Sequence, residues 1–197
     1  QILEPITKPM NKSNLRQALE TIECPHLLVI GDLMLDHYSW GEVDRVSPEA
    51  PIPIMKVKKE EQRLGGAGNV VMNLTTLGAE VSVCGITGKD LTGDIINKLL
   101  AENEVDCSGV IVSKNYKSCL KHRMIAGQTH LLRMDIDPDS NKDIPQNQLI
   151  EYLQGKVPKC DAVIVSGYGK GLLSSSVLKE LALCGKKHGI PIIGDPK

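Results

Sequence analysis

Gly65-Gly66-Ala67-Gly68-Asn69 stands directly before a segment of helical apolar spacing that ends at Leu77-Gly78. Glycines at the start of a helix let the backbone approach a ligand closely, and the helix N-terminus offers N–H groups to hydroxyl or phosphate oxygens. A tight turn made only for packing would use the same residues. The run therefore predicts a ligand-binding turn only if the rest of the chain supports it.

Around this run, apolar segments of strand length alternate with segments of helical spacing. The predicted strands are 27–30, 81–86, 162–165 and 190–193, and the predicted helices are 69–77, 91–103, 147–154 and 174–188. Continuous apolar character marks these strands as buried on both faces. Asp90 and Ser174 are placed as helix N-caps. The alternation predicts an α/β fold, with a parallel sheet and crossover helices.

Two stretches break this alternation. Residues 38–63 hold an alternating apolar and polar segment behind the proline-rich run 47–51, and residues 110–135 hold two strand-like runs joined at Gly127. Strands with one polar face suit a small antiparallel sheet that lies over the main one. We predict that the two segments form a lid inserted in one domain that spans residues 1–197.

Charge and composition exclude several classes of partner. The 23 basic and 24 acidic side chains nearly cancel, which predicts no binding of nucleic acid or of an anionic membrane. No apolar run reaches the ~20 residues of a membrane helix, and the start of the chain lacks the apolar core of a signal peptide. The six cysteines and five histidines are scattered, so we expect reduced, mostly buried thiols and no metal cluster. We expect a soluble, cytoplasmic protein.

A second signal follows the first predicted strand. Asp32 and Asp36, in Gly31-Asp32-Leu33-Met34-Leu35-Asp36, come where ligands bind in open α/β sheets, and carboxylates there either accept hydrogen bonds from sugar hydroxyls or only cap a turn. The sequence continues with Tyr38, Gly41, Arg45 and Ser47-Pro48-Glu49-Ala50-Pro51. With the glycine run and its spacing to Gly78 and Gly88, this resembles the PfkB, or ribokinase-type, carbohydrate kinases. The likeness is to bacterial heptose 7-phosphate kinases and covers nearly the whole chain; Val71 departs from it, since the family has a small residue there.

The resemblance implies a ribokinase-like fold: a parallel central sheet flanked by helices, with a small antiparallel β lid. It also implies that the C-terminal part of that fold is missing. In such kinases the positions of Asp36, Gly65, Gly66 and Asn69 bind the sugar. Arg45 falls in the lid, which family members often extend to a neighbouring subunit. A homodimer through the lid is therefore expected.

A third segment, Lys121-His122-Arg123 with the later Arg133, is also similar to the family. Residues two apart on a strand face the same side, so Lys121 and Arg123 converge and are predicted to hold a phosphate of the substrate. Arg133 is a candidate to join them. The alternative is a solvated face of the lid.

The last signals follow the two final predicted strands. Lys170 is predicted to contact the nucleotide or the sugar phosphate, or else to be an exposed loop residue. Asp195 and Lys197, in Asp195-Pro196-Lys197, resemble the run that the family places near the phosphate-transfer zone. Gly167 departs from the heptose kinases, which usually have aspartate there.

The resemblance implies transfer of the γ-phosphoryl group of ATP, with Mg²⁺, to the anomeric hydroxyl of D-glycero-D-manno-heptose 7-phosphate, a step towards lipopolysaccharide. The family's general base lies in a Gly-x-Gly-Asp run, which the sequence lacks, so the base and most contacts to ATP and Mg²⁺ are expected beyond Lys197. We predict no catalytic residue here and no activity for residues 1–197 alone. The alternatives are a kinase of the ribokinase, fructokinase or phosphofructokinase type, acting on another sugar or sugar phosphate, and a non-catalytic sugar-phosphate-binding or dimerisation module.

Overall fold

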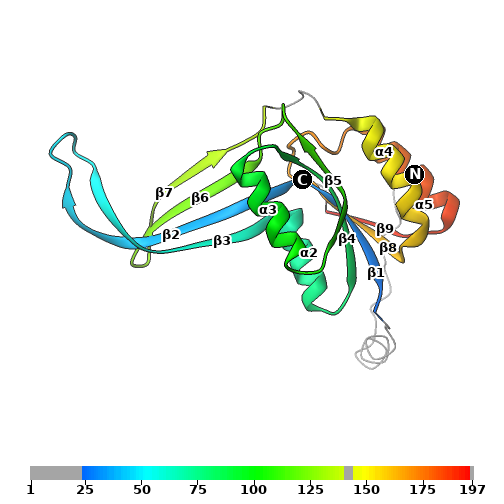
Figure 1. Cartoon of the computed structure of the whole chain (residues 1–197), viewed down its shortest axis with the longest axis horizontal. Coiled ribbons are helices and arrows are strands. Elements are labelled where there is room, and N and C mark those ends of the chain that lie inside the picture. Colours follow the sequence, from blue (N-terminus) through cyan, green and yellow to red (C-terminus); the bar gives the residue numbers. More distant parts are fainter. Residues whose placement is uncertain (1–23, 140–143, 196–197) are drawn as a thin grey trace.

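The computed structural model describes residues 24–139 and 144–195, which form two sheets and their flanking helices (Figure 1). The strands are β1 (His26–Gly31), β2 (Leu33–Val46), β3 (Pro53–Gly66), β4 (Glu80–Gly88), β5 (Asp106–Ser113), β6 (Cys119–Ala126), β7 (Thr129–Ile136), β8 (Ala162–Ser166) and β9 (Ile192–Asp195). The helices are α2 (Ala67–Thr76), α3 (Leu91–Ala101), α4 (Gln146–Lys156), the short 3₁₀ helix η1 (Val157–Lys159) and α5 (Ser175–His188).

The larger sheet has the strand order β5-β4-β1-β8-β9, and all its neighbouring strands are parallel. Strand β1 lies at its centre, and its successive side chains are buried on opposite faces of the sheet. Leu28 and Ile30 pack into the cluster under α4 and α5, whereas Val29 packs into the cluster under α2 and α3. Helices therefore cover both faces of the sheet, and the predicted α/β class is confirmed.

Local signals placed the helices well. Asp90 caps α3 by accepting a hydrogen bond from the Gly93 N–H, and Ser174 caps α5 by accepting one from the Val177 N–H, so both predicted N-caps are confirmed. The last strand begins two residues later than predicted. The Ile190 N–H donates to the Gly185 carbonyl as part of the end of α5, and Pro191 has no N–H to donate.

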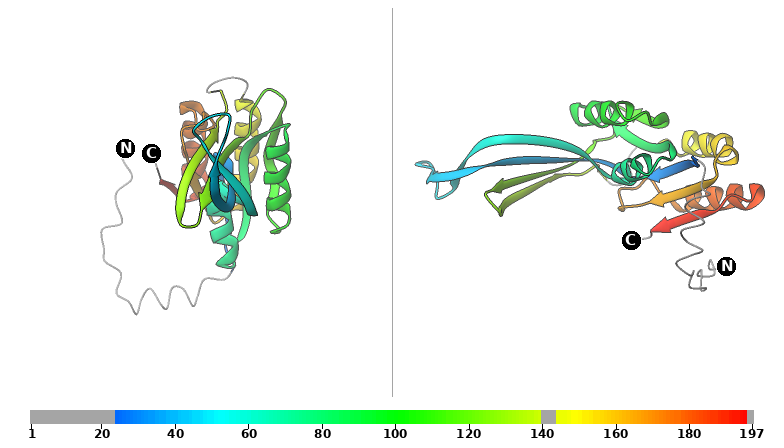
Figure 2. Two further views of the ribbon diagram at one scale, coloured as in Figure 1. Left: turned by 90° about the vertical axis from the view of Figure 1, so that its left-hand side faces the viewer. Right: turned by 90° about the horizontal axis from the view of Figure 1, so that it is seen from below.

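The smaller sheet has the order β3-β2-β6-β7 and extends as an arm away from the layered body (Figures 1 and 2). Its hairpins, β2–β3 and β6–β7, are antiparallel as expected, but β2 and β6, which join them, run parallel. The reason is that β2 and β6 follow the parallel strands β1 and β5, which leave the larger sheet at the same edge. The lid is thus a mixed sheet.

One boundary of the expected lid was wrong. Residues 110–113, predicted as the start of its second segment, belong to β5 in the larger sheet, where they pair with β4. Strand β5 is an edge strand and only partly buried. Its half-polar pattern therefore resembles that of a lid strand.

The cysteines and helices agree with the other expectations about the chain. All six cysteines are free, and four of them (Cys84, Cys119, Cys160 and Cys184) are buried, as predicted for reduced thiols. None of the described helices combines the length and the apolar character that crossing a bilayer requires.

Candidate functional site

The candidate site lies where the smaller sheet leaves the carboxyl edge of the larger one. Asp32 links β1 directly to β2, and β3 returns to end at Gly66, where α2 begins. The Ala67 N–H donates to the Asp32 carbonyl (3.0 Å). This bond fastens the glycine run to the end of the central strand.

Gly65 and Gly66 have no room for a side chain. A Cβ on Gly65 would lie 2.5 Å from Asp36 Oδ2, and one on Gly66 would lie 2.5 Å from the Asp32 carbonyl oxygen. Gly66 also has a φ of 55°, which favours glycine. The structure thus places the carboxylate of Asp36 directly over the glycine run. Asn69, two residues into α2, is exposed and lines a hollow of about 290 Å³ beside α3.

Asp36 meets the predicted cations across the β2–β6 pair. In the register of these strands Asp36 lies opposite Lys121, and Tyr38 lies opposite Arg123. The guanidinium of Arg123 donates to Asp36 Oδ1 and forms an ion pair with it. The Lys121 ammonium donates to Asp135 Oδ2 (2.9 Å). Both cations are partly buried, which argues against the solvated lid face that was the alternative.

The electrostatics keep these groups charged. Burial lowers the pKa of Arg123 and of Lys121, but the hydrogen bonds to Asp36 and to Asp135 outweigh it, so the pKa of both cations is raised. The Lys121 hydrogen bond in turn lowers the pKa of Asp135. The site is therefore a set of paired ions at neutral pH.

Lys170 joins the same set from the larger sheet. Its Nζ lies 2.7 Å from Asp137 Oδ2, and Lys121 Nζ lies 3.7 Å from Asp137 Oδ1. The Lys170 hydrogen bond lowers the pKa of Asp137. The sequence analysis did not single out Asp137; its spacing two residues after Asp135 was the signal available.

Asp32 holds the loop that carries Lys170. Its Oδ2 accepts hydrogen bonds from the backbone N–H groups of Tyr168 (2.6 Å) and Lys170 (3.3 Å). Its Oδ1 is buried and has no hydrogen-bond partner among the described residues. Asp32 therefore positions the loop after β8, and it is neither a turn cap alone nor an exposed sugar ligand.

An aromatic platform borders the site on β2. The guanidinium groups of Arg63 and Arg123 lie 5.4 Å and 5.1 Å from the ring centre of Tyr38, and the Trp40 ring stacks on Tyr38 at 5.4 Å. Sequence reasoning missed Arg63. Arg63 lies opposite Asp36 in the backbone register of the β2–β3 hairpin, so only the strand register places it at the site.

Of the other predicted residues, Arg133 joins the edge of this set, because it lies opposite Arg123 in the β6–β7 register and shares Asp135 with Lys121, whereas Arg45 does not. Arg45 is exposed, nine residues beyond Asp36 on β2, about 30 Å away at ~3.3 Å per residue. Arg133 is exposed and bonded to Asp135. Asp195 ends β9, and Lys197 lies outside the described residues. Of the predicted nucleotide contacts only the Lys170 side chain is described, and it is bound to Asp137. The contacts of Asp195 and Lys197 to ATP or Mg²⁺ stay predictions.

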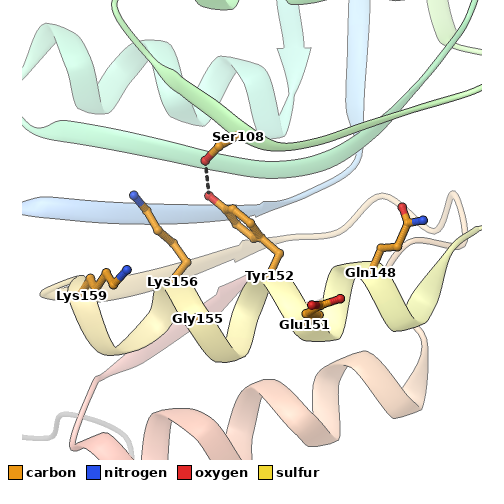
Figure 3. A pocket seen from close by; sticks show the side chains of 7 residues that line it. All are labelled: Ser108, Gln148, Glu151, Tyr152, Gly155, Lys156 and Lys159. Carbon is orange, nitrogen blue, oxygen red and sulfur yellow. Dashed lines mark hydrogen bonds between the residues drawn. The ribbon is translucent and has the colours of Figure 1, made fainter.

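A larger hollow than the one beside Asn69 lies elsewhere in the described part of the chain. It has a volume of about 470 Å³ and is formed by α4, η1 and the edge strand β5 (Figure 3). The hydroxyls of Ser108 and Tyr152 meet across it at 3.4 Å, and Lys156 is paired with Asp106 at 2.8 Å. None of the predicted site residues lines it.

Comparisons with known proteins agree with the fold. A family model described as pfkB family carbohydrate kinase matches residues 25–197. The "Bifunctional protein HldE" of Desulfatibacillum aliphaticivorans is 45% identical over 87% of this chain and 35% of its own length. The protein of the same name from Aliarcobacter butzleri is 40% identical over 88% of this chain and 37% of its own. The chain thus spans little more than a third of these relatives.

Solved structures show the same fold at low sequence identity. The ribokinase of Arabidopsis thaliana, in complex with ribose and ATP, aligns with a TM-score of 0.65 at 19% identity, over 88% of this chain and 54% of that one. Phosphofructokinase-2 of Escherichia coli, in complex with fructose-6-phosphate, aligns with a TM-score of 0.62 at 18% identity, over 88% and 55%. These likenesses establish a ribokinase-like fold.

Proposed function

The chain belongs to the pfkB family of carbohydrate kinases, and from this premise we propose that it binds the sugar phosphate for a kinase of D-glycero-D-manno-heptose 7-phosphate. The reaction would phosphorylate the anomeric hydroxyl in the cytoplasm, towards lipopolysaccharide. The family membership and the HldE relatives support a sugar kinase. The choice of heptose rests on the resemblance of the run from Gly31 to Pro51 to heptose kinases.

The observation that carries the proposal is the position of Asp36. Its carboxylate lies over the side-chain-free surface of Gly65 and is oriented by Arg123. A carboxylate fixed beside bare backbone can accept hydrogen bonds from two sugar hydroxyls while the sugar ring lies against the glycine run. Asp36 would thus bind and orient the sugar.

The cations next to Asp36 favour a phosphorylated sugar. Lys121 and Arg123 lie on one strand and Lys170 approaches from the other sheet, each already paired with a carboxylate. A phosphate group would compete for the same donors. Since a hydrogen bond to a charged group contributes about 1.5–3 kcal/mol, two such contacts distinguish a sugar phosphate from a neutral sugar by a large factor in affinity.

Calorimetric titration of the chain with heptose 7-phosphate, fructose 6-phosphate and ribose tests the proposal. We expect the heptose phosphate to bind tightest and ribose to bind weakest. Asp36→Asn and Arg123→Met should each weaken binding at least tenfold. Lys58→Met is the matched control, since Lys58 is an exposed lid cation paired with Glu42. Equal affinity for ribose and heptose phosphate would refute phosphate recognition, and a preference for fructose 6-phosphate would favour the phosphofructokinase alternative.

For catalysis we propose ATP as the donor and Mg²⁺ as its counterion, as the family membership implies, with the base and most nucleotide contacts supplied by sequence beyond Lys197. Residues 1–197 alone should bind the sugar phosphate without turning it over. An assay of ADP release with purified chain checks this. Robust ATP-dependent phosphorylation of the sugar would refute it, whereas binding without turnover in the full gene product would favour the non-catalytic module.

We also propose a homodimer through the lid. The smaller sheet exposes a set of large apolar side chains: Val43, Val46, Ile52, Val57, Leu131, Leu132 and Met134. Exposed apolar side chains on an arm that extends from the body are typical of an interface. Leu132→Lys should shift the molar mass measured by light scattering from dimer to monomer, and a wild-type chain that is monomeric at high concentration would contradict the proposal.

A further inference from the structure

On the opposite face of the lid from Asp36, the fold gathers a cluster that the proposed kinase site does not use. It consists of His37 on β2, Glu60 on β3 and His122 on β6, whose ligand atoms all lie within 4.8 Å of one another. Strand alternation separates His37 from its neighbours Asp36 and Tyr38, which face the other way. The cluster is therefore distinct from the proposed sugar site.

The strand register explains why the three residues meet. His37 and His122 are directly opposite each other in the parallel β2–β6 pair, and Glu60 lies opposite Ser39, two residues further along β2. The imidazole rings stack at 4.1 Å, and His37 Nε2 is 3.3 Å from Glu60 Oε1. Ser39 is buried, and its hydroxyl lies 2.7 Å from His122 Nε2 and 3.0 Å from Glu60 Oε1. One hydroxyl thus holds two of the three groups in place.

We propose that His37, Glu60 and His122 form a binding site for a divalent transition-metal ion of the zinc type. Two imidazole nitrogens and one carboxylate are a common donor set for zinc, with water as the fourth ligand. Mg²⁺ and Ca²⁺ prefer oxygen ligands and do not suit it. Binding requires the stacked rings to turn, so that both Nε2 lone pairs point at one ion.

The surroundings support this assignment. Ser39 is placed to orient Glu60 in the way that outer groups orient metal ligands. A bound ion would link β3, β2 and β6 and so tie the two hairpins of the lid together.

Metal titration tests the site without reference to kinase activity. The chain should be tag-free and stripped of metal with a chelator. It should also carry Cys24→Ser, since an exposed thiol such as that of Cys24 can bind zinc by itself. We expect one Zn²⁺ per chain by competition with a chromophoric chelator, a rise in melting temperature with Zn²⁺, Ni²⁺ or Cu²⁺, and none with Mg²⁺. Visible absorption of the Co²⁺-loaded protein should report nitrogen ligation.

Variants assign the ligands. His122→Gln and Glu60→Gln should each weaken Zn²⁺ binding at least tenfold, and Ser39→Ala by a smaller factor. His130→Gln, which removes an exposed histidine on β7, is the matched control and should bind within twofold of its parent. Melting curves without metal identify any variant that does not fold. If a variant does not fold, the Co²⁺ spectrum of the parent protein decides whether nitrogen atoms ligate the metal. Half an ion per chain, an unchanged affinity in His122→Gln or an equal loss in His130→Gln would each overturn the proposal.

Discussion

Replacing Gly65 with alanine should damage the candidate site and the stability of the chain together. The new Cβ would lie 2.5 Å from Asp36 Oδ2 and 2.9 Å from Met34 Cγ. Because ordinary carbon–oxygen contacts are about 3.3 Å or longer, the carboxylate must move by up to about 0.8 Å or rotate away from Arg123. Overpacking of this kind costs about 1–3 kcal/mol of unfolding free energy. Loss of a hydrogen bond from sugar to carboxylate, about 1.5–3 kcal/mol, corresponds to about 10- to 140-fold weaker sugar-phosphate binding.

Urea unfolding and calorimetric titration measure the two effects separately. Gly155→Ala is the matched control, because nothing lies within 4 Å of a Cβ at that position in α4. This substitution should stabilise the chain by about 0.5–1 kcal/mol and leave sugar-phosphate binding unchanged. If Gly65→Ala unfolds at the same urea concentration as the parent and binds the sugar phosphate equally well, then Asp36 does not depend on the bare backbone of Gly65.

Three further predictions concern other residues. Burial alone would raise the pKa of Asp106, but the hydrogen bond from Lys156 contributes to a pKa well below its ordinary range. This carboxylate therefore stabilises the fold above about pH 4 and stops doing so as the pH falls. Asp106→Asn should flatten the acid side of a plot of melting temperature against pH. Gly167→Asp should cost under about 1.5 kcal/mol of unfolding free energy, because its Cβ meets mainly the flexible end of Leu173, and a urea-unfolding loss of 3 kcal/mol or more would contradict this. Burial raises the pKa of Cys119 to about 12, so mass spectrometry should find this thiol unlabelled by alkylating reagents at pH 8 until the chain unfolds.

The larger sheet was predictable because its signals are local. Strand β1 is apolar from Leu27 to Ile30, and Asp90 and Ser174 mark the helix starts without reference to distant residues. The smaller sheet was harder to predict. Whether β6 runs parallel to β2 depends on which edge of the larger sheet both strands leave, and no residue in either strand encodes that.

The residues of the candidate site also fall into a group that local signals predict and a group that they do not. Asp36 and Gly65 were found from motifs, and the spacing of Lys121 and Arg123 placed them on one face. Arg63, Asp137 and the histidine cluster depend on which strands lie side by side, which the sequence does not state. His37 and His122 are far apart in the chain and meet only through the β2–β6 register.

The ion pairs at the site are weak enough for a phosphate to replace a carboxylate as the partner of a lysine. Asp137 contacts Lys121 of the lid and Lys170 of the larger sheet, so it links the two sheets through charge. These pairs are partly exposed, and such pairs contribute about 0–1 kcal/mol each. Deeply buried pairs, which cost about 3–5 kcal/mol to break, would resist replacement by a ligand. Weak pairs hold the cations in position and yield them to a phosphate, and a phosphate that replaced Asp137 between the two lysines would link the lid to the larger sheet in its place.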